Sequence, residues 1–208
     1  MDERTTSLEG ELDPVVARAR RGDENALAEL FERHRPRLRR MIEARLDRRL
    51  QGRVDASDVM QDAYLNLARK LDSYNERDGL PFFLWLRLVT GECLIDLHRR
   101  HLQTAKRDAK LEVAIHQGPM PQTDSYSIAA MLLGRHTTAS QQLMRAEAQL
   151  ELQEALNGME PLDREILVLR HFEELSNQEA ARVLDIDPSA ASSRYFRALR
   201  RLKGFLGH

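Results

Sequence analysis

Residues 176–203 read SNQEAARVLDIDPSAASSRYFRALRRLK, a stretch that predicts two short helices separated by about three residues. Ser176 followed by Glu179 matches a capping box, in which each side chain bonds the backbone N–H of the other residue. Asp187 and Pro188 then provide the N-cap and the first residue of the second helix. A tight connection between two such helices indicates a helix-turn-helix.

The second predicted helix has two different faces when its residues are placed about 100° apart. One arc is apolar and consists of Ala191, Tyr195, Ala198, Leu199, Leu202, Phe205 and Leu206. The opposite arc holds the candidate DNA-binding residues Ser189, Ser193, Arg194, Arg197, Arg200 and Arg201, and Phe196 stands at its edge without an assigned role. Arginine binds guanine edges or phosphates through two parallel hydrogen bonds, and serine bonds either group. The arc therefore suits a DNA groove, although an ordinary solvated basic helix shows the same pattern.

The length and composition favour a mostly helical protein in a reducing compartment. The chain has 208 residues, many charged and few aromatic side chains, and a single cysteine, Cys93. One cysteine excludes an internal disulfide, and its place on an apolar helix face predicts a buried thiol. No apolar run approaches the roughly 20 residues needed to cross a membrane, and the acidic start does not resemble a signal peptide. We expect no membrane insertion and a cytoplasmic location.

Charge is unevenly distributed along a chain whose net charge is only −1. Basic residues crowd segments 35–53 and 98–110 and the C-terminal helix, whereas acidic residues gather in the first residues, in 55–62 and in 147–165. Separate basic and acidic surfaces predict one nucleic-acid partner and one protein partner.

The apolar spacing predicts an all-α fold of two small helical domains joined by a linker. We expect a disordered acidic tail over residues 1–11, a first domain over 12–115, a linker over 116–139 and the helix-turn-helix domain over 140–208. Pro36 marks a kink or a boundary in the first domain. Within the linker, the apolar stretch 127–133 predicts one or two helical turns that dock on a domain or occupy a channel in a partner.

A helix that begins after Asp55 carries an acidic outer arc. The residues on this arc are Asp58, Gln61, Asp62, Leu65 and Arg69. An apolar Leu65 among carboxylates predicts a docking patch for a basic partner helix, with Leu65 as its anchor. The alternative is an acidic first turn that favours the helix dipole, beside an unremarkable exposed leucine. The chain has no phosphate-binding glycine loop, nucleophile elbow or metal-spaced Cys/His cluster, so no catalytic residue, metal or cofactor is expected.

Taken in order, these motifs resemble a bacterial sigma factor of the sigma-70 family, in the extracytoplasmic-function (ECF) subgroup. DASDVMQDAYL at 55–65 resembles the polymerase-binding helix of the family's first domain. FLWL at 83–86 with LIDLHRR at 94–100 resembles its promoter −10 helix, and LDREIL at 162–167 opens a stretch that resembles the −35-reading domain. Two departures stand out. Gly91-Glu92 replaces a frequent Arg-Asn pair, which argues against direct base contact there, and Asp185 replaces a frequent turn glycine, which Asp can do by adopting left-handed geometry.

The resemblance implies an alternative sigma factor without catalytic activity, which binds core RNA polymerase and directs promoter recognition and transcription initiation. The acidic arc would bind the clamp helices of the β′ subunit, and the β flap would be a second polymerase contact. The −10 region of promoter DNA would meet Tyr74, Arg77, His98, Arg99 and Arg100, although Tyr74 is equally compatible with packing at a helix end. The resemblance leaves open whether an anti-sigma factor binds the chain. The rival interpretations are a stand-alone helix-turn-helix regulator and a helical enzyme or RNA-processing factor.

Overall fold

The computed structural model describes residues 14–50, 52–74, 79–102, 120–134 and 142–206, and all regular elements in these ranges are helices. The N-terminal half contains α1 (Pro14–Arg20), α2 (Glu24–Glu43), α3 (Ala56–Lys70) and α4 (Phe82–Leu102), with short turns η1 (Arg48–Leu50) and η2 (Leu71–Ser73). The C-terminal half contains α6 (Ser125–Leu133), α7 (Gln142–Asn157), α8 (Pro161–Leu167), the π-helical turn η5 (Val168–Phe172), α9 (Asn177–Leu184) and α10 (Pro188–Leu206). The all-α prediction is confirmed. The predicted acidic tail and Arg77 lie outside the described ranges.

The predicted capping residues begin and end their helices as expected. Ser176 and Glu179 form the capping box of α9, with the Ser176 N–H donating to the Glu179 carboxylate at 2.7 Å. Asp55 caps α3 and forms a second capping box with Asp58. Asp185 ends α9 in the left-handed region at φ 53°, ψ 48°, so the helix-turn-helix turns without glycine at this position.

Pro36 neither ends nor divides a helix, because α2 runs through it from Glu24 to Glu43. The helix ends are fixed instead by Asp23, whose side chain accepts the Ala26 N–H at 3.0 Å, and by Ala44 after the last turn. A proline interrupts one backbone hydrogen bond, and here the apolar face of α2 buries Leu30, Phe31, Leu38 and Ile42 on both sides of it.

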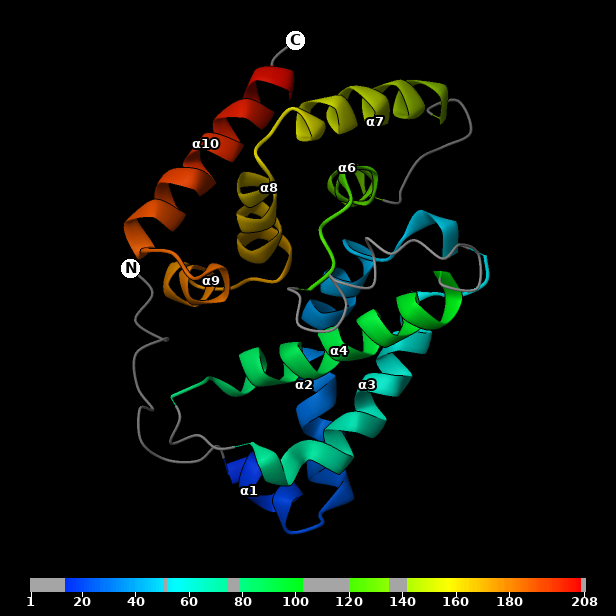
Figure 1. Ribbon diagram of the computed structural model, residues 1–208, viewed down its shortest axis with the longest axis vertical. Helices are drawn as coiled ribbons and strands as arrows, with labels where there is room; N and C mark the ends of the chain where they lie inside the picture. The colour runs from blue at the N-terminus through cyan, green and yellow to red at the C-terminus, as the bar shows by residue number, and fades with distance from the viewer. Residues whose placement is uncertain (1–13, 51, 75–78, 103–119, 135–141, 207–208) are drawn as a thin grey trace.

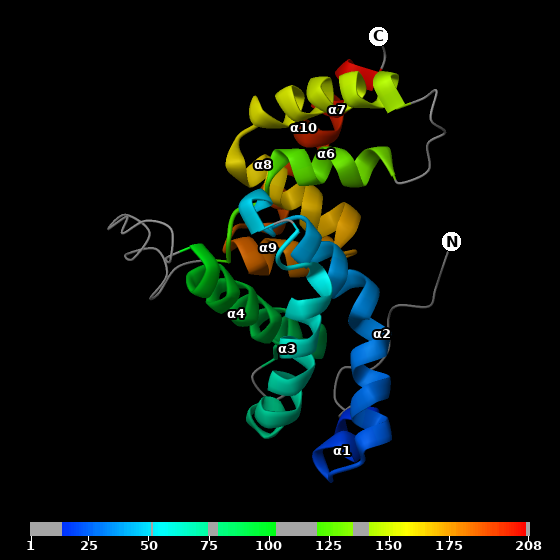
Figure 2. The same cartoon turned by 90° about the vertical axis from the view of Figure 1, so that its right-hand side faces the viewer.

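The two halves pack against each other rather than standing apart. In Figure 1, α1 to α4 occupy the lower part of the molecule and α6 to α10 the upper part, and Figure 2 shows the same division from the side. One cluster of buried apolar side chains continues from α2, α3 and α4 into Ile166, Leu169 and Ala180 of the C-terminal half. The thiol of Cys93 lies in the N-terminal part of this core, donates to the Val89 carbonyl at 3.2 Å and is buried, as predicted.

The apolar part of the predicted linker is a packed helix. α6 begins at the N-cap Asp124, whose side chain accepts the Ser127 N–H at 2.9 Å. Ile128 and Ala129 are fully buried in a second apolar cluster, which they share with α7, α8 and α10. The prediction that this stretch docks on a domain is confirmed.

Candidate nucleic-acid and polymerase interfaces

The outward face of α10 carries most of the predicted DNA-binding side chains. The opposite face packs on the helical core through Ala191, Ala198 and Leu202, which are all buried. Five of the six predicted DNA-binding residues are exposed, namely Ser189, Ser193, Arg197, Arg200 and Arg201. This face of α10 is therefore open to a partner.

Arg194 differs from its neighbours because a buried carboxylate of α8 binds its side chain. Asp163, the third residue of α8, is buried and lies between two arginines of α10. Its Oδ1 accepts a hydrogen bond from Arg194 Nη1 at 2.8 Å, and its Oδ2 accepts one from Arg197 Nη1 at 3.3 Å. The side chain of Arg194 is 28% exposed and that of Arg197 is 60% exposed. Of the two, Arg197 is the one presented to the outside.

Phe196 is 63% exposed and lies at the edge of the basic arc, next to Ser189 on the helical wheel. Its residue type alone gave no reason to expect exposure. In a major groove, an apolar side chain in such a position contacts the C5-methyl group of thymine. The face therefore combines hydrogen-bond donors with one apolar contact point.

The acidic arc of α3 is exposed at the positions predicted for polymerase binding. Asp58, Gln61, Leu65 and Arg69 are all exposed, and Leu65 keeps 47% of its surface accessible. The Asp58 carboxylate also accepts the Asp55 N–H at 2.8 Å, so Asp58 stabilises the start of the helix as the alternative interpretation required. The structure therefore contains both the exposed acidic patch around Leu65 and an acidic residue that stabilises the start of the helix.

Asp62 connects the predicted polymerase residues to the predicted −10 residues. Its Oδ2 forms an ion pair with Arg100 Nη2 at 2.9 Å, between two partly exposed side chains on α3 and α4. A small cavity of about 320 Å³ lies beside this pair and is bordered by Asp58, Gln61 and His101. The acidic arc and Arg100 thus lie on one continuous surface of the N-terminal half.

The remaining −10 candidates are less accessible. Tyr74 is 3% exposed, donates its hydroxyl to the Leu80 carbonyl at 3.1 Å and contacts the rings of Phe82 and Trp85, so the packing alternative describes its position. His98 Nε2 accepts the Asp47 N–H at 3.3 Å, and burial lowers the pKa of His98, which keeps the ring neutral near pH 7. Arg99 pairs with Asp96 at 3.5 Å within α4. Arg100 is the most outward member of this set that the structure describes.

A cluster of four charges, three of them buried, joins the two halves, and the sequence pattern did not reveal it. Arg45 and Arg87 come from the N-terminal half, and Glu165 and Glu173 come from the C-terminal half. Glu173 is fully buried between Arg45 Nη1 at 2.7 Å and Arg87 Nε at 2.6 Å. Glu165 pairs with Arg45 and lies 3.8 Å from Arg87. We call these residues the junction cluster; its formal charges sum to zero.

The charges of the junction cluster stabilise one another. Burial alone would raise the pKa of Glu173, but the guanidinium groups of Arg45 and Arg87 outweigh this effect and hold that pKa below its ordinary value. For Arg45, burial acts to lower the pKa, and the carboxylates of Glu165 and Glu173 outweigh it and raise the pKa. Glu173 and Arg45 are therefore both charged in the folded protein near neutral pH.

Surface contacts surround the junction cluster. Arg37 Nε on α2 donates to the Glu173 carbonyl at 2.6 Å, and Arg40 forms an ion pair with Glu174. Glu174 has a φ of 56°, in the left-handed region, at the turn that leads from η5 towards α9. The turn at 173–174 thus contacts one side of α2.

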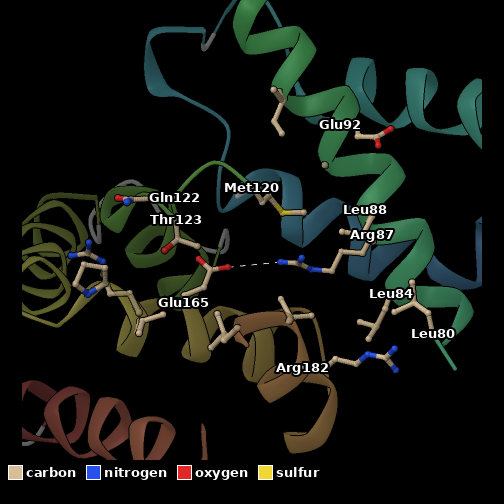
Figure 3. A pocket seen from close by; sticks show the side chains of 17 residues that line it. Leu80, Leu84, Arg87, Leu88, Glu92, Met120, Gln122, Thr123, Glu165 and Arg182 are labelled. Atoms are coloured by element: carbon tan, nitrogen blue, oxygen red, sulfur yellow. Dashed lines mark ion pairs between the residues drawn. The ribbon is translucent and has the colours of Figure 1, made fainter. Parts of the chain in front are cut away.

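A cavity of about 700 Å³ opens at the same junction, between α4, α8 and α9. Figure 3 shows Arg87 and Glu165 reaching toward each other across it, with Leu84, Leu88 and Met120 on its wall. Arg182 borders the cavity and donates a hydrogen bond to the Gly79 carbonyl of the other half. The floor of the cavity is ionic and its walls are largely apolar.

In the part of the chain that the structure describes, no group of three or more His, Cys, Asp and Glu side chains is placed to hold a metal ion. No helix among those residues combines the length and the apolar character that a membrane span requires.

Two family models match the chain in the order of its two halves. The model for Sigma-70 region 2 matches residues 30–104, which contain most of α2 and all of α3 and α4. The model for Sigma-70, region 4 matches residues 149–202, from within α7 to within α10. The polymerase and −10 candidates fall in the first match, and the candidate DNA-binding residues of α10 fall in the second.

Similar proteins agree with these matches. The ECF RNA polymerase sigma factor SigD of Mycobacterium tuberculosis is 31% identical over 198 residues, covering 95% of this chain and 85% of that protein. The sigma factor CarQ of Myxococcus xanthus is 27% identical over 195 residues, covering 92% of this chain and 95% of that protein. The solved structure of CnrH in complex with the cytosolic domain of CnrY has a similar fold, with a TM-score of 0.54, 22% identity and coverage of 93% and 96%. The chain belongs to the ECF RNA polymerase sigma factors, which direct core RNA polymerase to promoters.

Proposed function

We propose that the two halves of this sigma factor divide the work between polymerase and promoter. The surface formed by Asp58, Gln61, Asp62, Leu65 and Arg69 binds the clamp helices of the polymerase, and Arg100 extends the same surface toward the −10 element. The face of α10 binds the −35 element. The protein acts in the cytoplasm and carries no catalytic activity of its own.

The observation that carries this proposal is the presence of two chemically different exposed faces on separate helices. The α10 face offers serine hydroxyls and guanidinium groups, which bind phosphates and base edges. The α3 face offers carboxylates around Leu65, which is 47% exposed and suits a basic helical partner. A stand-alone helix-turn-helix regulator would require only the first face.

A protein inhibitor of the anti-sigma kind is a further proposed partner. Leu88 and Leu162 border the 700 Å³ cavity and are 53% and 38% exposed, so the junction offers apolar contact area to a helix from such a protein. CnrH, which has a similar fold, is solved with a partner chain.

Separation-of-function variants test the division of work. Leu65→Arg should abolish binding to core polymerase and run-off transcription, because it places a cation against a basic partner helix. Arg197→Ala should leave core binding intact and weaken promoter selection. Leu150→Arg is the matched control, since Leu150 is 60% exposed and belongs to α7, a helix that carries none of the predicted contact residues.

The outcomes distinguish the rival functions. Core binding that survives Leu65→Arg would show that the docking face is misassigned. Sequence-specific promoter binding by the chain without polymerase, at full affinity, would favour the stand-alone regulator.

A further inference from the structure

Asp163 lies behind the DNA-facing arginines, and neither residue composition nor spacing drew attention to it. Its side chain is only 4% exposed, and it sits in the first turn of α8, where the helix core fixes its position. Its two oxygens bind different arginines of α10, Arg194 at 2.8 Å and Arg197 at 3.3 Å. A buried carboxylate with two charged partners cannot turn toward DNA, so it acts only through the arginines.

The two arginines use this carboxylate differently. Arg194 has 28% of its side chain exposed, so its contact with Asp163 mainly fastens α10 to α8. Arg197 engages Asp163 through Nη1 while 60% of its side chain remains exposed. A guanidinium group has five N–H donors in a planar fork, so one contact at Nη1 leaves other donors for a second partner.

A base edge requires the guanidinium plane in one orientation. The bidentate contact with guanine O6 and N7 needs two parallel hydrogen bonds, whereas a phosphate accepts a cation from many directions. A free arginine on a helix surface samples many rotamers and must lose them on binding, and a fixed partner behind the side chain removes part of that cost beforehand.

From this geometry we propose that Asp163 is a positioning residue for sequence readout: it orients Arg197 so that the outer edge of the guanidinium group reads one guanine of the −35 element. The inference rests on the proposed role of α10 in binding that element. It adds that specificity at one base pair depends on a residue of α8, which never touches DNA.

The Asp163 carboxylate also lowers the overall affinity for DNA, while it raises discrimination between bases. A negative charge beside the DNA-facing surface weakens phosphate binding at every sequence. Removing it while keeping the side-chain shape should therefore raise non-specific affinity and lower base discrimination together. A purely structural residue would not produce this combination.

The test uses the full chain bound to bacterial core RNA polymerase. The probe is a pool of promoter duplexes with a randomised −35 segment, from which the wild-type holoenzyme selects its preferred sequence. Discrimination is then the ratio of dissociation constants for the selected duplex and for each single-base variant. Asp163→Asn should reduce discrimination about 3- to 10-fold at one guanine position and leave the other positions unchanged.

Two further variants separate positioning from charge and from folding. Glu160→Gln removes a carboxylate from the exposed N-cap residue of α8, which makes no side-chain capping bond, and should raise non-specific affinity without changing discrimination. Arg197→Lys keeps the charge but not the fork and should lose discrimination at the same guanine. In the Arg197→Lys background, Asp163→Asn should cause no further loss.

Three outcomes would overturn the inference. The first is that Asp163→Asn and Glu160→Gln change discrimination and non-specific affinity equally, and the second is that Asp163→Asn lowers discrimination evenly at all positions. The third is that Arg197→Lys keeps full discrimination at the guanine. The last result decides the question even if Asp163→Asn does not fold, because Arg197 is exposed and its replacement spares the core. A wild-type holoenzyme that selects no sequence would instead refute the proposed function, and this inference with it.

Discussion

Replacing Glu173 with glutamine tests the junction cluster most directly. The substitution keeps the size of the side chain and one carbonyl oxygen for hydrogen bonding, but it removes one of two negative charges that balance Arg45 and Arg87. A net positive charge then remains in a site where Glu173 and Arg45 have fully buried side chains and Arg87 is 4% exposed.

The size of the effect follows from this burial. Removing one partner of a buried ion pair costs about 3–5 kcal/mol, because the other charge stays out of water without compensation. For a chain of this length each kcal/mol lowers the melting temperature by about 2–4 °C, so Glu173→Gln should melt about 6–20 °C below the wild type. Glu174→Gln is the matched control: the neighbouring carboxylate is 58% exposed, pairs with Arg40 at the surface and should contribute less than about 1 kcal/mol.

Urea unfolding at pH 7, followed by far-UV circular dichroism, measures these differences. A double-mutant cycle sharpens the result, since Arg87→Met removes the cation that Glu173→Gln leaves unbalanced. The double variant should be more stable than Glu173→Gln alone. A Glu173→Gln protein within 1 kcal/mol of the wild type would refute the reasoning, as would a double variant in which the two losses simply add.

The same residue predicts an acid dependence. The pKa of Glu173 is lowered in the folded protein, so the unfolded chain binds a proton at a higher pH than the folded chain does. Stability from this group is complete above the unfolded value of about 4.3 and is lost as pH falls through the lower folded value. Glu173→Gln should flatten this part of the acid-denaturation curve.

Three further predictions concern single positions. Asp185→Gly should stabilise the protein by about 0.5–1 kcal/mol in urea unfolding, because glycine adopts the left-handed geometry at φ 53° without strain; a loss of stability would contradict this. Phe196→Ala should weaken holoenzyme binding to the selected −35 duplex. Replacing one thymine of that duplex by deoxyuridine, which lacks the methyl group, should weaken binding by the wild type but not by this variant. An equal effect of deoxyuridine on both proteins would exclude a methyl contact. The Cys93 thiol, whose pKa is raised by burial, should react with iodoacetamide only after urea unfolding, and rapid alkylation of the native protein would disprove its burial.

Local features of the fold could be predicted from the sequence because their causes lie within a few residues. The capping boxes of α3 and α9 join residues three positions apart, and Asp185 ends α9 by its own backbone geometry. The two faces of α10 follow from helical periodicity alone. The exposure of Leu65 also agrees with its place on the acidic arc.

The junction could not be predicted, because its partners are far apart in the chain. Arg45 belongs to a segment crowded with arginines that looks like a solvated surface, yet its partner Glu165 is 120 residues away. Arg87 gave the one local signal, as a single cation within the apolar run at 82–89. Pro36 predicted a kink or a boundary, and the boundary does not form, because packing of α2 on both sides of the proline outweighs the local preference for a break.

The junction cluster also determines how easily the two halves can part. Ions regain their hydration when an interface opens, so a junction closed by charges separates into water at less cost than an equally large apolar one. The junction cluster therefore fixes the geometry of the packed halves and still lets them separate at a lower cost than an apolar interface of the same size.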